Sequence, residues 1–142
     1  YRLPTEAEWK RAWTLGGGAA EAYASDEAAD KDAIFLFNAF DDFDGKEKPR
    51  KAGSKAPNAL GLYDMAGNVA EWAVTPGSTN RFVLGGHYKG TYDQLGAACR
   101  LDEHFDWNLN YPNEPKSIWW FVDAEWTGIR LVCEPASGFK AP

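Results

Sequence analysis

The sequence NALGLYDMAGNVAEW, which occupies residues 58–72, decides the fold more than any other part of the chain. It combines glycines, amides, a carboxylate and aromatic rings too densely for a plain strand or an amphipathic helix. Gly61 and Gly67 allow backbone angles that other residues avoid. Asn68 and Glu71 lie where a bent backbone could leave several carbonyls pointing inward, and calcium is held by carbonyl and carboxylate oxygens. The stretch predicts either a calcium-binding loop or a structural loop that buries Glu71.

The composition predicts one domain that is rich in loops. The 142 residues include seven Trp, eight Phe and six Tyr, together with 14 Gly and eight Pro. This length is enough for one domain with a real core, and buried rings that hold long loops fit the composition better than a helical bundle. No apolar run approaches the length of about 18 residues that spans a membrane. The net charge of −6 argues against a nucleic-acid partner.

Regular elements are expected to be few and short. Thr5 and Glu8 form a capping box that opens a helix, and the glycines at 16–18 end it. The apolar run 34–40 predicts a buried strand or a tight turn. The other expected elements are a short helix within 19–33, strands at 81–88, 96–101 and 128–133, and loops at 41–57 and 102–127.

Four blocks of the sequence resemble the motifs of the formylglycine-generating enzyme (sulfatase-modifying factor) family. They are RLPTEAEW at 2–9, GLYDMAGNVAEW at 61–72, RFVLGGHY at 81–88 and GIRLV at 128–132. The resemblance implies an α+β fold, the irregular, loop-rich family variant of the C-type-lectin-like fold, with a capped N-terminal helix and short antiparallel strands. In the family a long N-terminal portion precedes the first block. Residues 1–142 are therefore expected to form a fragment, a domain completed by another chain, or a reduced domain that closes without that portion.

The resemblance also implies two calcium sites. The first would use the side chains of Asn38 and Asp44 and the carbonyls of Ala39 and Lys46, with Asp41 and Asp42 as substitutes for Asp44. The alternative is an Asx-turn in an exposed acidic loop. The second site would use the carbonyls of Ala66, Gly67 and Val69 and the Glu71 side chain, whereas Asn68 is expected to buttress the loop through side-chain-to-backbone bonds.

The family's copper chemistry is not expected here. Formylglycine-generating enzymes hold copper with two cysteines that follow the Gly-Gly turn, because Cu(I) needs soft thiolate ligands. In this chain those two positions hold Gly90 and Leu95. The sulfoxide synthases of the same superfamily hold iron in a separate His-rich domain, whereas this chain has His87 and His104 alone. Two unrelated polar histidines are favoured over an iron site that would need both to converge with a carboxylate.

The two cysteines of the chain are Cys99 and Cys133. The resemblance implies a structural disulfide between them, since some family members carry cysteine pairs in these segments. Such a bond would close a loop of about 34 residues and contribute roughly 3–4 kcal/mol. It would also imply an extracytoplasmic location, periplasmic or secreted. The alternative is a pair of buried free thiols.

The aromatic loop at 102–127 holds the ligand candidates, which are Trp107, Asn108, Asn110 and Tyr111. Rings mixed with amides can stack on sugars or grip a peptide, although they can equally form a core that holds the loop down. The sequence therefore favours a non-catalytic, calcium-stabilised binding or accessory module whose ligand is a glycan or a protein. The alternatives are an oxidoreductase of the same superfamily that needs further residues, and a structural subunit that pairs with a chain carrying the N-terminal portion.

Overall fold

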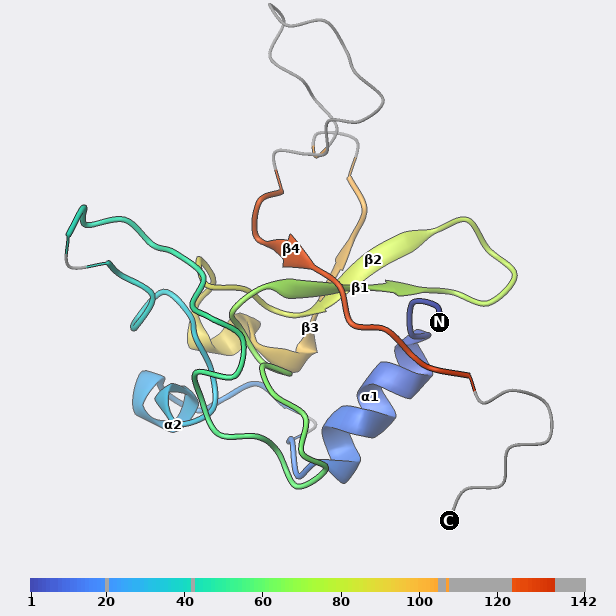
Figure 1. Ribbon diagram of the computed structural model, residues 1–142, viewed down its shortest axis with the longest axis horizontal. Coiled ribbons are helices and arrows are strands. Elements are labelled where there is room, and N and C mark those ends of the chain that lie inside the picture. Colours follow the sequence, from blue (N-terminus) through green and yellow to red (C-terminus); the bar gives the residue numbers. More distant parts are fainter. Residues whose placement is uncertain (20, 42, 105–106, 108–123, 135–142) are drawn as a thin grey trace, which may run out of the picture.

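The structure is a computed structural model that describes residues 1–19, 21–41, 43–104, 107 and 124–134. Short elements are joined by long irregular segments, which confirms the expected loop-rich α+β architecture (Figure 1). Among the described residues, no helix has the length and apolar character needed to cross a membrane. The elements are α1 (Glu6–Leu15), α2 (Asp26–Asp30), β1 (Ala70–Val74), β2 (Arg81–Gly85), the 3-10 helix η1 (Tyr92–Gln94), β3 (Gly96–Asp102) and β4 (Thr127–Gly128).

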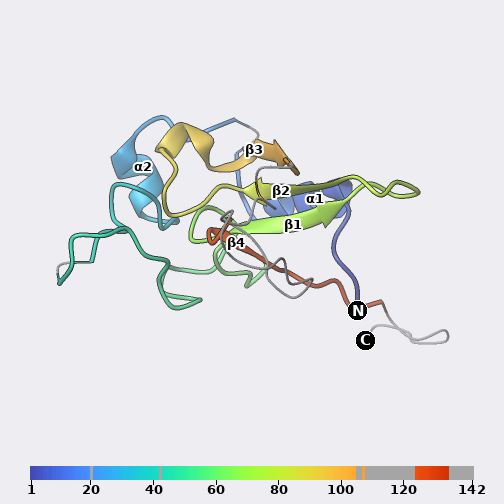
Figure 2. The ribbon, with the colours of Figure 1, turned by 90° about the horizontal axis from the view of Figure 1, so that it is seen from above.

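The described strands form one sheet with the order β3-β2-β1-β4. β1 and β2 are antiparallel with Glu71 opposite Leu84, and β2 and β3 are antiparallel with a bulge at Leu84/Gly85. β4 runs parallel to β1, with Ala70 opposite Thr127. Helix α1 lies along one face of this sheet, as two perpendicular views show (Figures 1 and 2).

The predicted capping box opens α1. The Thr5 hydroxyl accepts a hydrogen bond from the Glu8 backbone N–H at 3.2 Å, and the Glu8 carboxylate accepts one from the Thr5 N–H at 2.9 Å. The helix ends at Gly16, its C-cap, as the glycine run predicts. The indole rings of Trp9 and Trp13 are buried and stacked, with ring centroids 6.0 Å apart. This box therefore starts the helix whose aromatic face covers the sheet.

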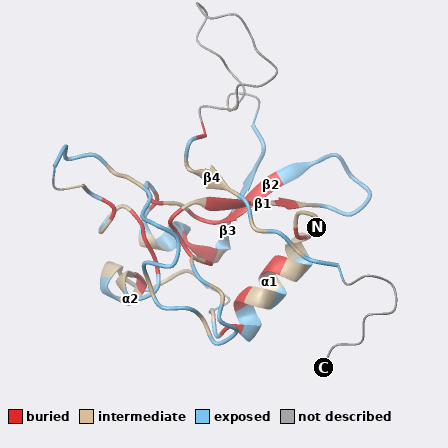
Figure 3. Ribbon diagram, viewed as in Figure 1, coloured by how far each residue is buried: buried red, intermediate tan, exposed pale blue. Residues whose placement is uncertain are grey.

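The core lies between α1 and the sheet (Figure 3). Its largest fully buried side chains are Trp9, Phe35, Phe82, Leu84, Leu95 and Val83. Phe35 comes from the predicted apolar run, which forms turns and two isolated β-bridges rather than a strand. One of these bridges pairs Ile34 with Gly67, where a Cβ on the glycine would lie 2.2 Å from the Ile34 carbonyl oxygen. Gly67 also has a φ of +70°, so this contact requires glycine for two reasons.

Two strand predictions need correction, and the glycine end of a third is confirmed. The central strand β1 was expected to be part of a loop, yet residues 70–74 pair with strands on both sides. The strand predicted within 81–88, with the pair Gly85-Gly86 as its end, does end at Gly85, because both glycines have positive φ angles and turn the chain. The strand predicted at 128–133 is shorter than expected, with β4 ending at Gly128 and a single later bridge from Val132 to Arg2.

Candidate functional site

A buried carboxylate near the end of the 58–72 stretch, Glu71, forms an ion pair with Arg130. The Glu71 carboxylate accepts hydrogen bonds from Trp9 Nε1 at 2.7 Å and from Arg130 at 2.8 and 2.6 Å. The Arg130 guanidinium also donates to the Tyr63 carbonyl at 2.7 Å. These bonds compensate the desolvation of the buried charge, and they join α1, β1, the preceding loop and the C-terminal segment. The geometry therefore matches the structural alternative in that Glu71 is buried and hydrogen-bonded, although strand β1 rather than a loop carries it.

The loop before β1 is held by Asn68, as the sequence predicts. Its side chain accepts a hydrogen bond from the Arg50 N–H at 2.9 Å and donates one to the Arg50 carbonyl at 3.1 Å. Asn68 is buried and has a φ of +59°, so the backbone turns at this residue. Its side-chain amide satisfies the backbone N–H and carbonyl of Arg50, as a neighbouring strand would do in a sheet. The remaining predicted members of the second calcium site, Ala66, Gly67 and Val69, lie in the same turn, where Ala66 and Gly67 are buried and Val69 is half-buried.

The groups predicted for the first calcium site already have partners. Asn38 Oδ1 accepts from the Phe35 N–H at 2.9 Å, and the Ala39 carbonyl accepts from the Lys48 N–H at 3.0 Å. The Lys46 carbonyl in turn accepts from the backbone N–H of Asp41 at 2.9 Å. Asp44 accepts from the Lys46 N–H at 3.1 Å and forms an ion pair with the Lys48 ammonium at 2.7 Å. No group of three or more His, Cys, Asp or Glu side chains suited to a metal occurs among the described residues. Calcium binding therefore stays a prediction.

The predicted disulfide is absent, because both cysteines are free thiols. Cys99 is buried on β3, where burial raises the pKa of its thiol, and Cys133 is exposed. β3 lies at one edge of the sheet, and Cys133 follows β4, which lies beside β1 at the other edge. The extracytoplasmic location, which depended on this bond, stays a prediction.

Both positions that carry copper cysteines in the family are built into the core. Gly90 is buried, donates its N–H to the His87 carbonyl at 2.9 Å and accepts from the Leu36 N–H at 3.0 Å. The Leu95 side chain is fully buried. At these two positions the structure therefore has a hydrogen-bonded glycine backbone and a buried apolar side chain in place of the two thiols.

A row of aromatic rings covers the face of β1 opposite α1. Glu71 points toward Trp9 of α1, and successive strand residues alternate, so Trp72 and Val74 point to the other face. Trp72 contacts Trp107 edge-to-face at 5.8 Å between ring centroids, and Trp107 contacts Trp126 at 5.0 Å. The row ends at His87, whose ring lies 4.4 Å from that of Trp126.

The aromatic row borders a groove of about 760 Å³, which we call the aromatic groove. Trp72 and Trp107 line it together with other apolar side chains and with charged side chains of both signs. The other lining residues are Arg2, Leu3, Val74, Arg81, Glu103, Ala124, Glu125, Thr127, Gly128 and Ile129. A concave, mainly apolar surface with a few charged groups is the usual form of a ligand site.

His87 is electrically neutral at neutral pH. Burial lowers its pKa to about 4, and the positive charge of Lys89 contributes to the shift. His87 Nδ1 accepts a hydrogen bond from the Lys89 N–H at 3.2 Å. The Lys89 ammonium itself pairs with the Glu125 carboxylate at the groove wall. His87 therefore serves as an aromatic surface for Trp126 rather than as a cation.

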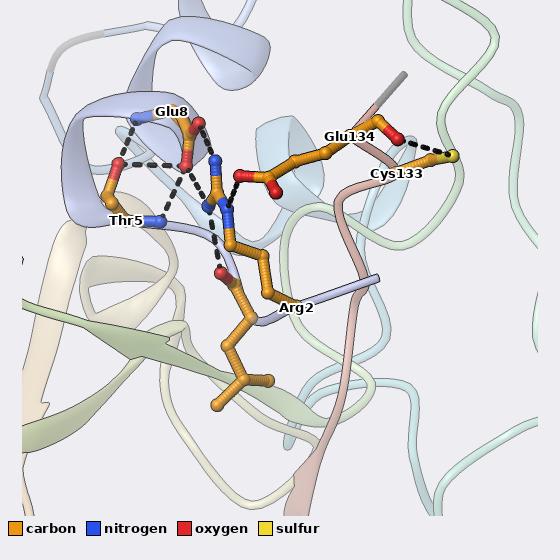
Figure 4. A network of polar contacts seen from close by, with 6 residues as sticks. Arg2, Thr5, Glu8, Cys133 and Glu134 are labelled. Carbon is orange, nitrogen blue, oxygen red and sulfur yellow. Dashed lines mark hydrogen bonds and ion pairs between the residues drawn. The ribbon is translucent and has the colours of Figure 1, made fainter. Parts of the chain in front are cut away.

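One wall of the groove is fixed by Arg2 (Figure 4). Its guanidinium makes two hydrogen bonds to the Glu8 carboxylate, at 2.7 and 2.6 Å, and a third to Glu134 at 2.6 Å. The backbones of Arg2 and Val132 also exchange two hydrogen bonds, at 3.1 and 2.8 Å. These contacts hold the first residues of the chain beside the C-terminal segment, and the Arg2 interaction lowers the pKa of Glu8 to about 2.

The sequence identified part of the groove. Trp107, one of the predicted ligand contacts, lines it, whereas Asn108, Asn110 and Tyr111 lie outside the described residues. That these residues bind a ligand stays a prediction. Sequence reasoning missed Trp72 because the strand that carries it was not predicted. The signal for this strand was the sequence Glu71-Trp72-Ala73-Val74, because successive side chains of a strand point to opposite faces of the sheet.

These observations define a class of protein, a loop-rich α+β domain that retains the formylglycine-generating-enzyme motifs without the copper cysteines. Residues 1–111 match the sulfatase-modifying factor enzyme 1-like domain, and the chain belongs to this family.

Relatives of known name share parts of the chain. It is 45% identical over 71 residues to serine/threonine-protein kinase pkn1 of Chlamydia pneumoniae, which covers 50% of this chain and 10% of the kinase. It is 33% identical over 106 residues to the chaperone protein LppX of Paenibacillus barcinonensis, which covers 61% of this chain and 38% of LppX. The solved structure of Treponema denticola variable protein 1 has a TM-score of 0.57 at 29% identity, over 72% of this chain and 41% of that protein. The matched region spans less than half the length of each of these three proteins.

Proposed function

We propose that this chain is a non-catalytic binding module of the family, that the aromatic groove is its binding surface, and that its ligand is a polypeptide. The observation that carries the proposal is the groove, whose volume of about 760 Å³ is bordered by Trp72 and Trp107. Trp side chains are enriched among the residues that dominate binding energy, because each supplies a large, rigid contact area.

The groove lining favours a polypeptide over a glycan. Leu3, Val74 and Ile129 surround the two indoles with aliphatic surface, which suits apolar side chains better than sugar hydroxyls. Arg81 and Glu103 place one charge of each sign at the rim, where they can orient a peptide by its own charges. The similarity to a protein named as a chaperone adds support for a polypeptide ligand.

The residues at the Gly-Gly turn support a role without redox catalysis. Copper chemistry in this family needs a thiolate pair, and Gly90 and Leu95 cannot supply one. Cys99 lies nearby in sequence, yet its thiol is buried and burial raises its pKa, which disfavours the thiolate that binds a metal.

The test is to probe the protein on a peptide array and on a glycan array. Wild type is compared with Trp107→Ala, which removes a groove ring, and with Phe43→Ala, which removes a ring that is 95% exposed and does not line the groove. Circular dichroism spectra of all three proteins are compared to check that each is folded. The proposal expects wild type and Phe43→Ala to bind the same peptides, and Trp107→Ala to bind them at least about tenfold more weakly, as expected for a central aromatic contact.

Two outcomes would contradict the proposal. Binding to glycans without binding to peptides would reassign the ligand class. Equal peptide binding by Trp107→Ala and wild type would place the binding surface outside the aromatic groove.

A further inference from the structure

Each of the two segments that the family resemblance assigns to calcium is held by a cation of the chain itself. Lys48 places its ammonium nitrogen 2.7 Å from Asp44 Oδ2 and 3.3 Å from Asp41 Oδ2. Arg130 places its guanidinium on the Glu71 carboxylate with two hydrogen bonds. In both places a side chain already neutralises the carboxylate that would attract a metal ion.

The backbone oxygens of the first segment do not converge on one point. Residues 39–41 and 43–48 form the two sides of a small hairpin in which Phe40 and Glu47 make an antiparallel bridge. The carbonyl of Ala39 points across it to the Lys48 N–H, and the carbonyl of Lys46 points back to the Asp41 N–H. Carbonyls on facing antiparallel strands point in opposite directions, whereas calcium needs roughly six to eight oxygens around one centre at about 2.3–2.6 Å. These two carbonyls therefore do not fit a shared ion.

Asn38, the remaining member of that set, is fixed in another role. Its oxygen accepts from the Phe35 N–H at 2.9 Å, and its nitrogen donates to Asp30 Oδ1 at 2.7 Å and to the Ala33 carbonyl at 2.9 Å. Three bonds orient this amide toward the turn at 33–35. An ion at this oxygen would have to use its second lone pair, in a direction fixed by the Phe35 bond.

The second segment has the same conflict in a buried setting. Glu71 accepts one hydrogen bond from Trp9 and two from Arg130, and it is 5% exposed. A divalent ion on this carboxylate would lie within a few ångströms of the guanidinium, and like charges repel strongly where water is excluded. The donor set does not fit an ion at this position.

From these contacts we infer that Lys48 and Arg130 are built-in cations that replace calcium, and that the domain folds without a metal ion at either segment. Because exposed ion pairs contribute little to stability, the backbone hydrogen bonds hold the small hairpin and Lys48 balances its charge. Arg130 does more, since its carboxylate partner is buried. The inference stands on contacts away from the aromatic groove and is independent of the proposed function.

The test measures calcium binding to the full chain after dialysis against a chelator. Calcium chloride is titrated into the protein by calorimetry, and the thermal midpoint is recorded in chelator and in calcium. The inference expects no saturable binding and the same midpoint in both conditions, because a ligand that binds the native state raises the midpoint. Saturable binding of calcium that is lost in Asp44→Asn or Glu71→Gln would overturn it.

A pair of variants tests the role of Lys48 directly. Lys48→Met leaves Asp41 and Asp44 without their shared cation, whereas Lys46→Met removes the same charge from a side chain with no ion pair among the described residues. We expect the released carboxylates of Asp41 and Asp44 to attract calcium, so that calcium raises the thermal midpoint of Lys48→Met and leaves that of Lys46→Met unchanged. Equal responses of the two variants would show that Lys48 does not replace the ion.

Discussion

Arg130 and Glu71 are 59 positions apart in sequence, and their side chains make a two-point hydrogen-bonded ion pair at 2.8 and 2.6 Å on the α1 side of the sheet. The arginine comes from the last family motif and the glutamate from the central one. Two of the four motifs that identify the family therefore meet in one contact. The third, at the N-terminus, joins them through the Trp9 indole.

Removing the arginine should strongly destabilise the fold. Arg130→Met leaves the Glu71 carboxylate buried with the Trp9 bond alone, and an uncompensated buried charge costs about 3–5 kcal/mol. The free energy of unfolding, measured in urea, gives the cost. The double variant Glu71→Gln/Arg130→Met should recover part of it, because neither charge remains. An Arg130→Met protein with the stability of wild type would show that the pair does not hold these segments together.

The Arg2–Glu8 pair should stabilise the protein at pH values above the usual pKa of a glutamate, and this stabilisation should be lost in acid. The pKa of Glu8 is lowered from 4.5 to about 2, chiefly by hydrogen bonds from Arg2. Its contribution is therefore fully present above pH 4.5 and disappears as the pH falls toward 2. Glu8→Gln keeps a capping-box side chain and removes the charge.

The measurement for Glu8 is the unfolding free energy of wild type and Glu8→Gln across this pH range. The two should differ near neutral pH and converge in acid, and high salt should reduce the difference. Glu21→Gln, at an exposed position in the same N-terminal third, is the control for the loss of one negative charge. A gap between wild type and Glu8→Gln that stays constant with pH would contradict the assignment.

His87 should destabilise the fold in mild acid. Its pKa is lowered from 6.5 to about 4, so the unfolded chain binds a proton more readily than the native state between these values. Stability is therefore lost as the pH falls from 6.5 to about 4. His87→Phe keeps a ring against Trp126 and removes the titration, so its stability should fall less over this range, as urea unfolding at several pH values would show. Parallel pH profiles for the two proteins would mean that His87 is not buried as a neutral ring.

Gly67 should tolerate no side chain. Gly67→Ala combines a φ of +70° with a methyl group 2.2 Å from the Ile34 carbonyl oxygen. Gly77 has a similar φ of +73° with no heavy atom within 4 Å of the added carbon, which makes Gly77→Ala the matched control. We expect a loss of about 1–2 kcal/mol for Gly77→Ala from its backbone angle, and of more than about 3 kcal/mol for Gly67→Ala. Thermal or urea unfolding measures both, and equal losses would show that the contact with Ile34 is not tight.

The sequence predicted the elements whose signals are local. The capping box of Thr5 and Glu8, the glycine end of α1 and the strand that begins at Arg81 each depend on a few adjacent residues. β1 was missed because its pattern places a charged Glu71 on the buried face. That arrangement becomes acceptable once Arg130 is known to lie beside it, and no local rule brings these two residues together.

The candidate sites were harder to predict for a related reason. The expected calcium ligands were carried over from the family resemblance, and the sequence does not reveal the hydrogen bonds that the carbonyls of Ala39 and Lys46 make with facing backbone N–H groups. The aromatic groove needs both Trp72, which lies on β1, and Trp107, which lies much later in the sequence. Their contact depends on tertiary structure, so the sequence could nominate Trp107 but not its partner.

The walls of the aromatic groove come from Arg2 and Leu3 at one end of the chain and from Thr127–Ile129 near the other. Bringing these two segments together closes a loop of more than about 100 residues, which costs more conformational entropy than any local turn in the fold. Occupation of the groove and docking of the C-terminal segment are therefore one linked equilibrium, in which each raises the probability of the other. A bound ligand would bridge these two segments, slow their local opening and protect them from proteases while it remains in place.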